Sequence, residues 1–297
     1  MRVFVTGASG FVGSAVVQEF LAHGHDVTGL ARSGDSAAQL EKAGAAVVRG
    51  AIQDLDALRQ GAGAADGVIH CAFNHDFSKF AQNSEDDRAA IEAMGGALEG
   101  TNRPLLATSG LAMLATGRPA TEADRLPSPS DHFPRQSEAA TLRVAERGVQ
   151  ASVVRLPPTT HGKGDHGFVP ALIRIARETG KAAYIGDGEN RWAAGHRQDA
   201  ARLYRLALEH GAKDGPFHAV AEEGIPMKRI AGLIGERLGL PVVALSPEEA
   251  HAHFGIFAMF VSMDMRGSSE RTRALLGWAP TQPDLLTDMV ENSYFDA

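Results

Sequence analysis

The chain has 297 residues, a formal net charge of −7, 44% hydrophobic residues and 22% charged residues. This length and composition are typical of a folded protein that buries roughly three quarters of its unfolded surface, and they exclude a largely disordered chain. No basic block occurs, so neither nucleic acid nor an anionic membrane surface is an expected partner.

The first feature along the chain is a glycine-rich turn within residues 3–13, which read VFVTGASGFVG. An apolar strand runs into Gly7, Gly10 and Gly13, and apolar residues then recur at helical spacing before the next predicted strand. Such a turn aims backbone N–H groups and the positive end of a helix at one point, where a pyrophosphate can bind. The order of elements predicts dinucleotide binding, with a plain structural turn as the alternative.

Strands and helices alternate over the first half of the chain. The predicted strands are Val3–Thr6, Val27–Leu30, Ala46–Arg49, Gly67–His70, Pro104–Thr108 and Ser152–Leu156. Helical periodicity lies between them at Asp54–Gln60, Asp86–Leu98 and Ser137–Arg147. This alternation predicts an α/β fold of the Rossmann type, a doubly wound parallel sheet with its ligand at the C-terminal ends of the strands.

The end of the second strand bears on the choice of nucleotide. An NAD-selective site usually places Asp or Glu there to hold the ribose 2′-hydroxyl, whereas this chain has Arg32 followed by Ser33. A guanidinium can clamp a 2′-phosphate, and the serine hydroxyl can add a hydrogen bond. NADP is therefore expected in preference to NAD, and the alternative is an exposed loop arginine without a ligand.

The pattern changes after Leu156, where Pro157–Pro158 interrupts the alternation and a Gly-rich loop follows at residues 161–167. The sequence GDGEN at residues 186–190 predicts a hairpin turn, because Gly and Asn accept the positive φ values of such turns. Further along, Asp199 is a candidate N-cap for a helix that would return to the sheet.

Shorter elements follow Gly215. They are a strand at Phe217–Val220, a helix at Met227–Leu238 after Pro226, a strand at Val242–Leu245 and a helix at Glu248–Phe254. The apolar run over Phe254–Val261 would serve a lobe core, a substrate pocket or a dimer face. We expect a dinucleotide-binding domain over residues 1–160 with a returning segment at about 195–212. Residues 161–194 and 213–297 would form a smaller C-terminal substrate lobe.

Five segments together resemble the extended short-chain dehydrogenase/reductases of the epimerase/dehydratase superfamily, and more narrowly their atypical members. They are TGASGFVG (6–13), IHCAF (69–73), RLPPTTHG (155–162), GDGENRWAAGHRQDAA (186–201) and LGWAP (276–280). The resemblance spans nearly the whole chain. It implies a Rossmann domain that binds a nicotinamide dinucleotide and a lobe that binds a small-molecule substrate.

The resemblance also implies cofactor contacts at the strand ends. The turn would hold the phosphates through Gly7, Ser9, Gly10, Phe11, Val12 and Gly13. Ala51, where the family usually has Asp, and Ile52 would lie beside the adenine, and Cys71, Ala72 and Phe73 along the ribose. Leu156, Pro157 and Pro158 would approach the nicotinamide. For Cys71 and the preceding His70, a packed side chain without a ligand is the simpler interpretation.

The catalytic positions depart from this resemblance. Enzymes of the family use a Tyr-xxx-Lys pair on the helix after the fifth strand, with a Ser or Thr at the end of that strand, to move a proton to or from a carbonyl. The segment PRQSE (134–138) puts Pro134 at the Tyr position and Glu138 at the Lys position. Gly110 takes the hydroxyl position, and Ser109, one residue earlier, is the candidate that remains.

Other side chains could supply the proton. His132 precedes the Tyr position, and His161, Lys163 and His166 lie in the loop expected to overhang the nicotinamide, near Tyr184. His161 is the candidate donor among them, although each is more simply explained as a surface or packing residue. A metal site from the His and Asp side chains of this loop lacks ligand spacing on a regular element, so no metal is expected.

Two hypotheses follow, and a third ranks behind them. The first is an NADP(H)-dependent oxidoreductase that acts on a small carbonyl-like substrate with a non-standard proton donor. The second is a non-catalytic NADP(H)-binding protein that senses redox state, and the third is an epimerase or dehydratase. The one cysteine fits a reducing cytosol, and Met1 leads directly into the first strand, so a cytoplasmic location without a signal peptide is expected. A homodimer is possible on family grounds.

Overall fold

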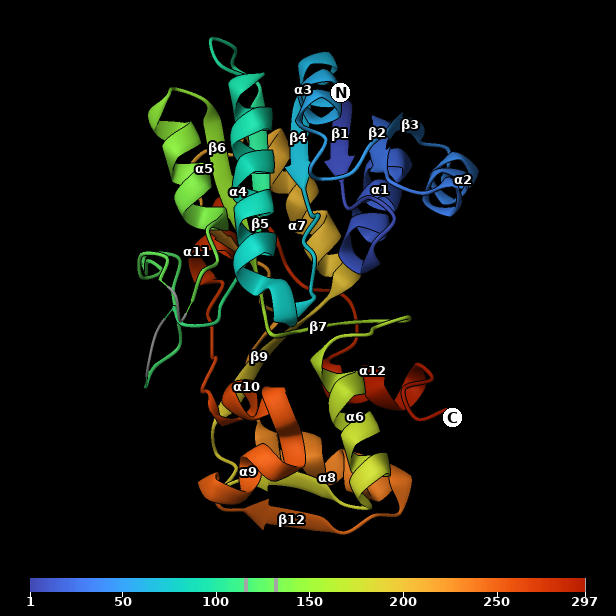
Figure 1. Ribbon diagram of the computed structural model, residues 1–297, viewed down its shortest axis with the longest axis vertical. Helices are drawn as coiled ribbons and strands as arrows, with labels where there is room; N and C mark the ends of the chain where they lie inside the picture. Colours follow the sequence, from blue (N-terminus) through green and yellow to red (C-terminus); the bar gives the residue numbers. More distant parts are fainter. Residues whose placement is uncertain (115–116, 131–132, 297) are drawn as a thin grey trace.

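The computed structural model describes residues 1–114, 117–130 and 133–296. Its centre is a seven-stranded parallel sheet with the strand order β10-β6-β5-β4-β1-β2-β3 (Figure 1). In chain order the strands are β1 (Arg2–Thr6), β2 (Asp26–Ala31), β3 (Ala46–Arg49), β4 (Gly67–His70), β5 (Pro104–Gly110), β6 (Gln150–Leu156) and β10 (Phe217–His218). The chain winds outward from β1 in both directions, which confirms the predicted doubly wound fold.

Helices cover both faces of this sheet because successive strand residues point to opposite sides. Val3 and Val5 join the apolar cluster under α1 (Phe11–Ala22), α2 (Gly34–Ala43) and α7 (Arg197–Glu209). Phe4, between them, joins the cluster under α3 (Leu55–Ala64), α4 (Phe80–Gly96) and α5 (Ser137–Glu146). Phe4 is fully buried, a gain of about 1.5–3 kcal/mol for such a side chain.

Some predicted boundaries agree with the structure, others differ by a few residues, and the difference at the start of α4 has a clear reason. Strands β3 and β4 have the predicted bounds, whereas α4 begins at Phe80, well before the predicted start at Asp86. The extra turns of α4 carry polar residues that the apolar periodicity does not mark. Asn83 is buried there, and its amide nitrogen donates to the carbonyls of Asn74 at 3.0 Å and Asp76 at 2.8 Å.

A smaller lobe extends from the C-terminal edge of the central sheet (Figure 1). Its sheets are β11-β9-β7 and β12-β8, formed by β7 (Thr159–His161), β8 (Ala182–Ile185), β9 (Arg191–His196), β11 (Glu222–Pro226) and β12 (Val242–Leu245). Helices α6 (Phe168–Thr179), α8 (Met227–Leu238), α9 (Pro247–Phe254) and α10 (Ala258–Ser262) pack around them. Two more helices, α11 (Glu270–Leu276) and α12 (Leu285–Glu291), complete the chain. Across the described ranges, no helix combines the length and apolar character needed to cross a bilayer.

Two predictions about the second half are wrong. The GDGEN segment turns with φ values of +61° at Gly186 and +66° at Gly188, but its flanking strands join different sheets, so no hairpin forms. Asp199 is not the cap of α7, because the helix begins at Arg197 with His196 as N-cap. Asp199 instead accepts hydrogen bonds from the backbone of the C-terminal segment, at Thr281 and Gln282. Strand β10, which lies in the range expected for the smaller lobe, pairs with β6 of the central sheet.

Candidate functional site

The glycine-rich turn joins β1 to α1 with the geometry of a phosphate cradle. Gly7 has φ +64°, and the Gly10 N–H donates to its carbonyl at 2.9 Å. A Cβ on Gly13 would lie 2.0 Å from the Gly7 oxygen, and one on Gly7 would lie 2.7 Å from Ala72 N, so the turn requires glycine at both positions. Helix α1 has no side-chain cap and no acidic residue in its first turn. Its first N–H groups therefore suit a phosphate, as the fit to a dinucleotide requires.

Two arginines lie near the end of β2, beside the glycine-rich turn's edge of the sheet. Arg32 is exposed, and the Ser33 hydroxyl accepts from Ser36 N at 3.1 Å, which caps α2. Arg49, at the end of the neighbouring strand β3, donates to the Ser33 carbonyl at 2.6 Å. Arg49 was not among the predicted cofactor residues. Its position at the end of the strand that pairs with β2 could have indicated it, because that position lies beside Arg32 and Ser33.

The other predicted cofactor residues follow the ends of β3, β4 and β6, so the topology brings them to one edge of the sheet. Ala51, Ile52, Cys71, Ala72, Phe73, Leu156 and Pro158 are partly buried there, and Pro157 is buried. Burial raises the pKa of Cys71 to about 11, so this residue is a neutral thiol beside the hydroxyls of Thr108 and Tyr204. Cys71 packs, partly buried, against the apolar cluster under α1, α2 and α7.

A buried polar chain runs beneath the cofactor edge. His70 Nε2 donates to Asp87 Oδ1 at 3.0 Å, and its Nδ1 lies 2.7 Å from the Thr6 hydroxyl. The Ser137 hydroxyl, at the start of α5, donates to the other Asp87 oxygen at 2.6 Å and accepts from Arg135 Nε at 3.0 Å. These hydrogen bonds thus link β1, β4 and α4 to the guanidinium of Arg135, which lies just before α5.

Glu138, at the Lys position of the family motif, has a structural partner. Arg155 Nε and Nη2 each donate to its carboxylate at 2.8 Å, and the Ser109 hydroxyl donates at 2.9 Å. The side chain of Arg155 is only 2% exposed. Its Nη1 donates to His218 Nε2 at 3.1 Å, while His218 Nδ1 donates to the Ser268 carbonyl. Glu138 therefore neutralises a buried arginine from the neighbouring strand β6.

His161 lies at the end of β7 and is fully buried. Its Nδ1 lies 2.9 Å from Asp288 Oδ2 on α12, and within the described part of the chain its Nε2 has no hydrogen-bond partner. Burial opposes ionisation of Asp288, yet hydrogen bonds from His161 and Asn292 hold the pKa of that carboxyl below its usual value. The His196 ring contacts His161 edge-on, with 5.3 Å between ring centroids.

The loop after β7 approaches the glycine-rich turn. The His166 ring meets the edge of Phe11 with 5.7 Å between centroids, and Arg197 Cζ lies 4.9 Å from the centroid of the same ring. The Tyr294 hydroxyl donates to Asp165 Oδ2 at 2.9 Å and accepts from the Gly162 N–H at 3.2 Å. The C-terminal segment thereby holds this loop in place.

The remaining candidates lie apart from this edge or outside the described ranges. Lys163 is exposed, and Tyr184 is on β8 against the core of the smaller lobe. His132 falls outside the described residues. No group of three or more His, Cys, Asp or Glu side chains is arranged to hold a metal ion within the part of the chain that the structure describes.

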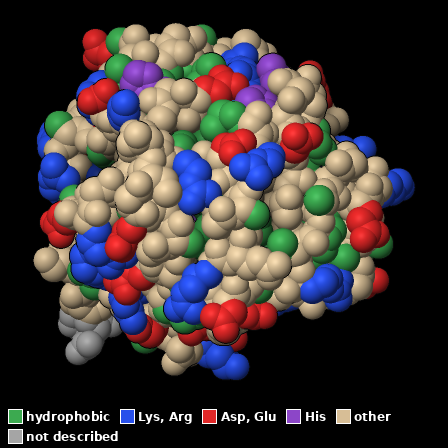
Figure 2. Space-filling model, turned by 90° about the horizontal axis from the view of Figure 1, so that it is seen from above, with side chains coloured by type: hydrophobic (Ala, Val, Ile, Leu, Met, Phe, Trp, Pro, Cys, Tyr) green, Lys and Arg blue, Asp and Glu red, His purple; other side chains and the backbone are tan. Residues whose placement is uncertain are grey.

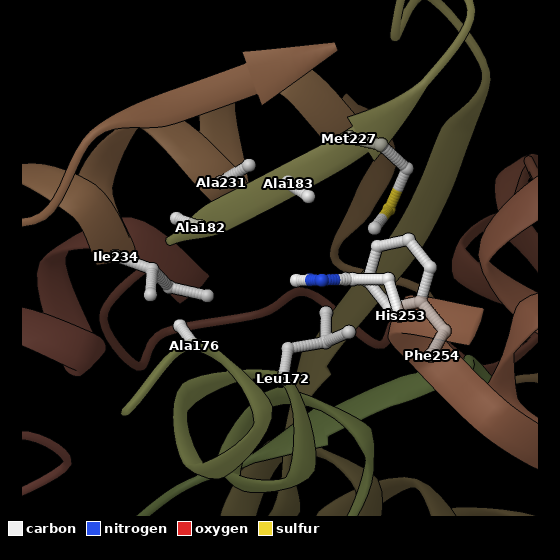
Figure 3. A pocket seen from close by; sticks show the side chains of 9 residues that line it. All are labelled: Leu172, Ala176, Ala182, Ala183, Met227, Ala231, Ile234, His253 and Phe254. Carbon is white, nitrogen blue, oxygen red and sulfur yellow. The ribbon is translucent and has the colours of Figure 1, made fainter. Parts of the chain in front are cut away.

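The smaller lobe has its own apolar core. The run over Phe254–Val261 divides between this core, where Phe254 and Val261 are buried, and the surface, where Ile256 and Met259 are exposed. A cavity in the core is lined by side chains from α6, β8, α8 and α9, with His253 among them (Figure 3). Its volume of about 10 Å³ is at the lower limit for one water molecule, so it holds no substrate.

The face seen from above in Figure 2 carries basic and acidic side chains interleaved, as the modest net charge implies. It shows no broad patch of one sign that would attract a polyanion.

The chain is similar to proteins of one known family. The model of the NAD dependent epimerase/dehydratase family matches residues 3–220. An uncharacterized protein of Schizosaccharomyces pombe is 50% identical over 297 residues, which cover 99% of this chain and 100% of that protein. A 4-hydroxy-2-methyl-3-oxo-4-farnesyl-3,4-dihydroquinoline-1-oxide ketoreductase of Stigmatella aurantiaca is 26% identical over 270 residues, 86% of this chain and 80% of its own.

Among solved structures, the dTDP-glucose 4,6-dehydratase of Streptomyces venezuelae with NAD bound has a TM-score of 0.76 and 20% identity. The match covers 99% of this chain and 96% of that one, so the two proteins share a fold over their full length. The family model and the high identity over the whole chain confirm the resemblance read from the motifs. The chain belongs to the NAD dependent epimerase/dehydratase family.

Proposed function

We propose that the protein is an NADP(H)-dependent oxidoreductase that acts on a small carbonyl compound and takes its proton from a group other than the family's tyrosine. The observation that carries the proposal is the cradle of three glycines in front of α1, whose first turn has no capping side chain. Membership of the family and the likeness to a ketoreductase support this reaction class.

The chain's own residues fit both phosphate groups of such a cofactor. The turn would hold the pyrophosphate, and Arg32 and Arg49 would hold the 2′-phosphate beyond β2. When bound, the nicotinamide supplies or accepts a hydride. The partly buried residues at the ends of β4 and β6 would line the rest of the nucleotide and limit the access of water.

Two residues are proposed to act near the carbonyl. The Ser109 hydroxyl donates a hydrogen bond to Glu138, so its oxygen would be free to accept a hydrogen bond from a substrate hydroxyl. With Nδ1 of His161 held by Asp288, its Nε2 is the nitrogen that would exchange a proton with the carbonyl.

The test measures both binding and turnover. Calorimetry with NADPH and NADH should give tighter binding of NADPH, and NADPH oxidation should be observed with part of a panel of aldehydes and ketones. Gly13→Ala should abolish nucleotide binding, because its Cβ would collide with the Gly7 oxygen. Gly232→Ala is the matched control, since a Cβ there meets nothing within 4 Å. Absence of association with either nucleotide at millimolar concentration would refute the proposal.

A second candidate function is favoured by the residues that stand at the Tyr and Lys positions of the family motif. Pro134 carries no proton, and Glu138 is engaged by Arg155. The protein would then bind NADP(H) without catalysis and report redox state to a partner. Such a sensor must bind the oxidised and reduced nucleotides with different affinities, because equal affinities shift no population. Calorimetry with NADP⁺ and NADPH decides this point, while epimerase or dehydratase chemistry fits the family and remains the third candidate.

We further propose a cytoplasmic location and a homodimer. Ile256 is 67% exposed and Met259 is 53% exposed, and large apolar side chains on the surface favour a contact between copies. Light scattering behind size-exclusion chromatography tests the dimer. A mass near 31.3 kDa across the concentration range would show a monomer and remove this proposal.

A further inference from the structure

Arg135 occupies an unusual place at the cofactor edge. It lies between Pro134 and the start of α5, and it is only partly exposed. Its Nε donates to the Ser137 hydroxyl at 3.0 Å and its Nη2 to the Thr108 carbonyl at 3.3 Å. Its Cζ lies 4.1 Å from the centroid of the Phe73 ring. These contacts fix the guanidinium over the end of β5 and leave Nη1 without a hydrogen-bond acceptor among the described residues.

No carboxylate of the described residues forms an ion pair with Arg135. The two acids whose charges favour its protonation, Asp87 and Glu138, are already engaged. Asp87 holds His70 and Ser137, and Glu138 holds Arg155 and Ser109. Arg155, the fully buried arginine of this region, has a bidentate carboxylate. A cation partly removed from water is costly without a counterion, so the site as it stands favours an incoming anion.

The surroundings of Arg135 limit its contact with water. Burial is the main cause that lowers the pKa of Arg135 and that of nearby His75, and the charge of Arg135 adds to the effect on His75. Phe73 covers one face of the guanidinium, so Nη1, which has no acceptor among the described residues, is the group that can donate to a ligand.

The position relative to the glycine-rich turn separates this site from the phosphate cradle. The sheet order places β4 between β1 and β5. With adjacent strands about 4.8 Å apart, the end of β5 lies about 10 Å from the turn after β1. The cofactor phosphates have donors of their own in the turn. An anion at Arg135 is therefore better explained by the substrate.

We propose that Arg135 binds a carboxylate of the substrate, so that the compound turned over is an oxo acid. The inference rests on the proposed function for the reaction, but its core, an anion subsite at the end of β5, stands on the contacts of Arg135. The Nη1 group would donate a charged hydrogen bond to this carboxylate, which would also orient the carbonyl of the same molecule.

The experiment compares matched acidic and neutral substrates. Reduction of 3-oxohexanoate and of its methyl ester by NADPH is measured with the wild-type protein, Arg135→Gln and Arg135→Lys. We expect Arg135→Gln to raise the KM for the acid by roughly 10- to 100-fold with little change for the ester, since a charged hydrogen bond is lost. Arg135→Lys should recover part of the affinity. Arg174→Gln, on the exposed face of α6, is the control and should leave the KM for both substrates unchanged.

Two further measurements separate the possible failures. Calorimetry with NADPH tests whether the anion is a cofactor phosphate, because a loss of NADPH affinity in Arg135→Gln would overturn the proposal. If no carbonyl compound is reduced, binding of 3-hydroxyhexanoate to the NADP⁺-loaded protein still tests the subsite. Binding that is lost in Arg135→Gln supports the subsite although the proposed reaction fails. Equal KM values of the wild type for the acid and the ester would overturn the proposal of a carboxylate subsite. Failure of the wild type to bind the hydroxy acid would overturn it as well.

Discussion

Glu138 reverses the charge that the family's lysine would carry, and its partners explain why the reversal is tolerated here. Arg155 is a buried cation on β6 that needs a carboxylate, and Glu138 supplies one from α5. Lysine at this position would leave Arg155 unpaired and add a second positive charge near Arg135. The charge at position 138 is therefore set by the packing of two neighbouring elements.

Restoring the family's residue should accordingly damage the protein. Glu138→Lys is expected to lower the free energy of unfolding by about 3–5 kcal/mol, the cost of breaking a buried pair. Urea denaturation at pH 7 measures it. The control Glu178→Lys disrupts an exposed pair on α6 and should change the free energy by less than about 1 kcal/mol. If Glu138→Lys were as stable as the control, the buried ion pair would not be stabilising the fold.

His218, which contacts Arg155, should make the stability of the protein depend on pH. Burial first, and then the charge of Arg155, lower the pKa of His218 from 6.5 to about 4. Its Nδ1 donates to a carbonyl in either protonation state, but its Nε2 accepts from Arg155, and that contact requires the neutral ring. Because the pKa is lower in the folded state, the contribution to stability is present above about pH 6.5 and is lost as the pH falls from 6.5 to 4.

Unfolding measurements across this range check the sign. At about 1.4 kcal/mol per pH unit, the loss between pH 6.5 and 4 should reach roughly 3 kcal/mol. His218→Gln keeps a donor and an acceptor but cannot titrate, so its stability should depend less on pH by about that amount. Identical slopes for the variant and the wild type would show that His218 is not the titrating group.

At the scale of elements, local patterns predicted what depends on neighbouring residues and missed what depends on distant ones. The turn at Gly7 and the bounds of α8 follow from short-range steric and capping rules, and they agree with the structure. The role of Asp199 could not be foreseen, because its partners at Thr281 and Gln282 lie far along the chain. A polar residue near a helix start looks like a cap whenever its tertiary partners are unknown.

The loop over residues 162–167 is held in place by the C-terminal segment. The Tyr294 hydroxyl bridges Asp165 and the Gly162 N–H, and burial raises the pKa of Asp165. Tyr294→Phe removes the bridge and leaves a buried acceptor unpaired, a cost of about 1–3 kcal/mol. Amide exchange in residues 162–167 should become faster. Tyr184→Phe, on β8, is the matched control and should leave the exchange of this loop unchanged.

At the scale of the whole molecule, the candidate site is assembled by contacts that no local pattern encodes. The predicted cofactor residues share one edge of the sheet because parallel strands end at the same edge, and this placement follows from the alternation of strands and helices. The pair of His161 with Asp288 spans 127 positions, and the pair of Arg155 with Glu138 joins a strand to a helix. Charge reversal at one end of such a pair looks like a lost function until its partner is known.

Nucleotide binding should stabilise the whole fold. The preference for NADPH over NADH should depend on Arg32, after β2. A ligand at about 100 times its Kd adds about 2.7 kcal/mol to the unfolding free energy. NADPH should therefore raise the melting temperature of the wild type more than NADH does at equal concentration. Arg32→Ala removes a proposed 2′-phosphate contact, so it should reduce the shift produced by NADPH and leave that produced by NADH.

The control for this comparison is Arg59→Ala, which alters an exposed arginine of α3 paired with Asp56. It should preserve both shifts, because it lies outside the proposed nucleotide contacts. If Arg32→Ala weakened both nucleotides alike, the arginine would act through the stability of the β2 corner. If it weakened neither, the 2′-phosphate would be held elsewhere, and Arg49, beside Ser33, would be the next residue to replace.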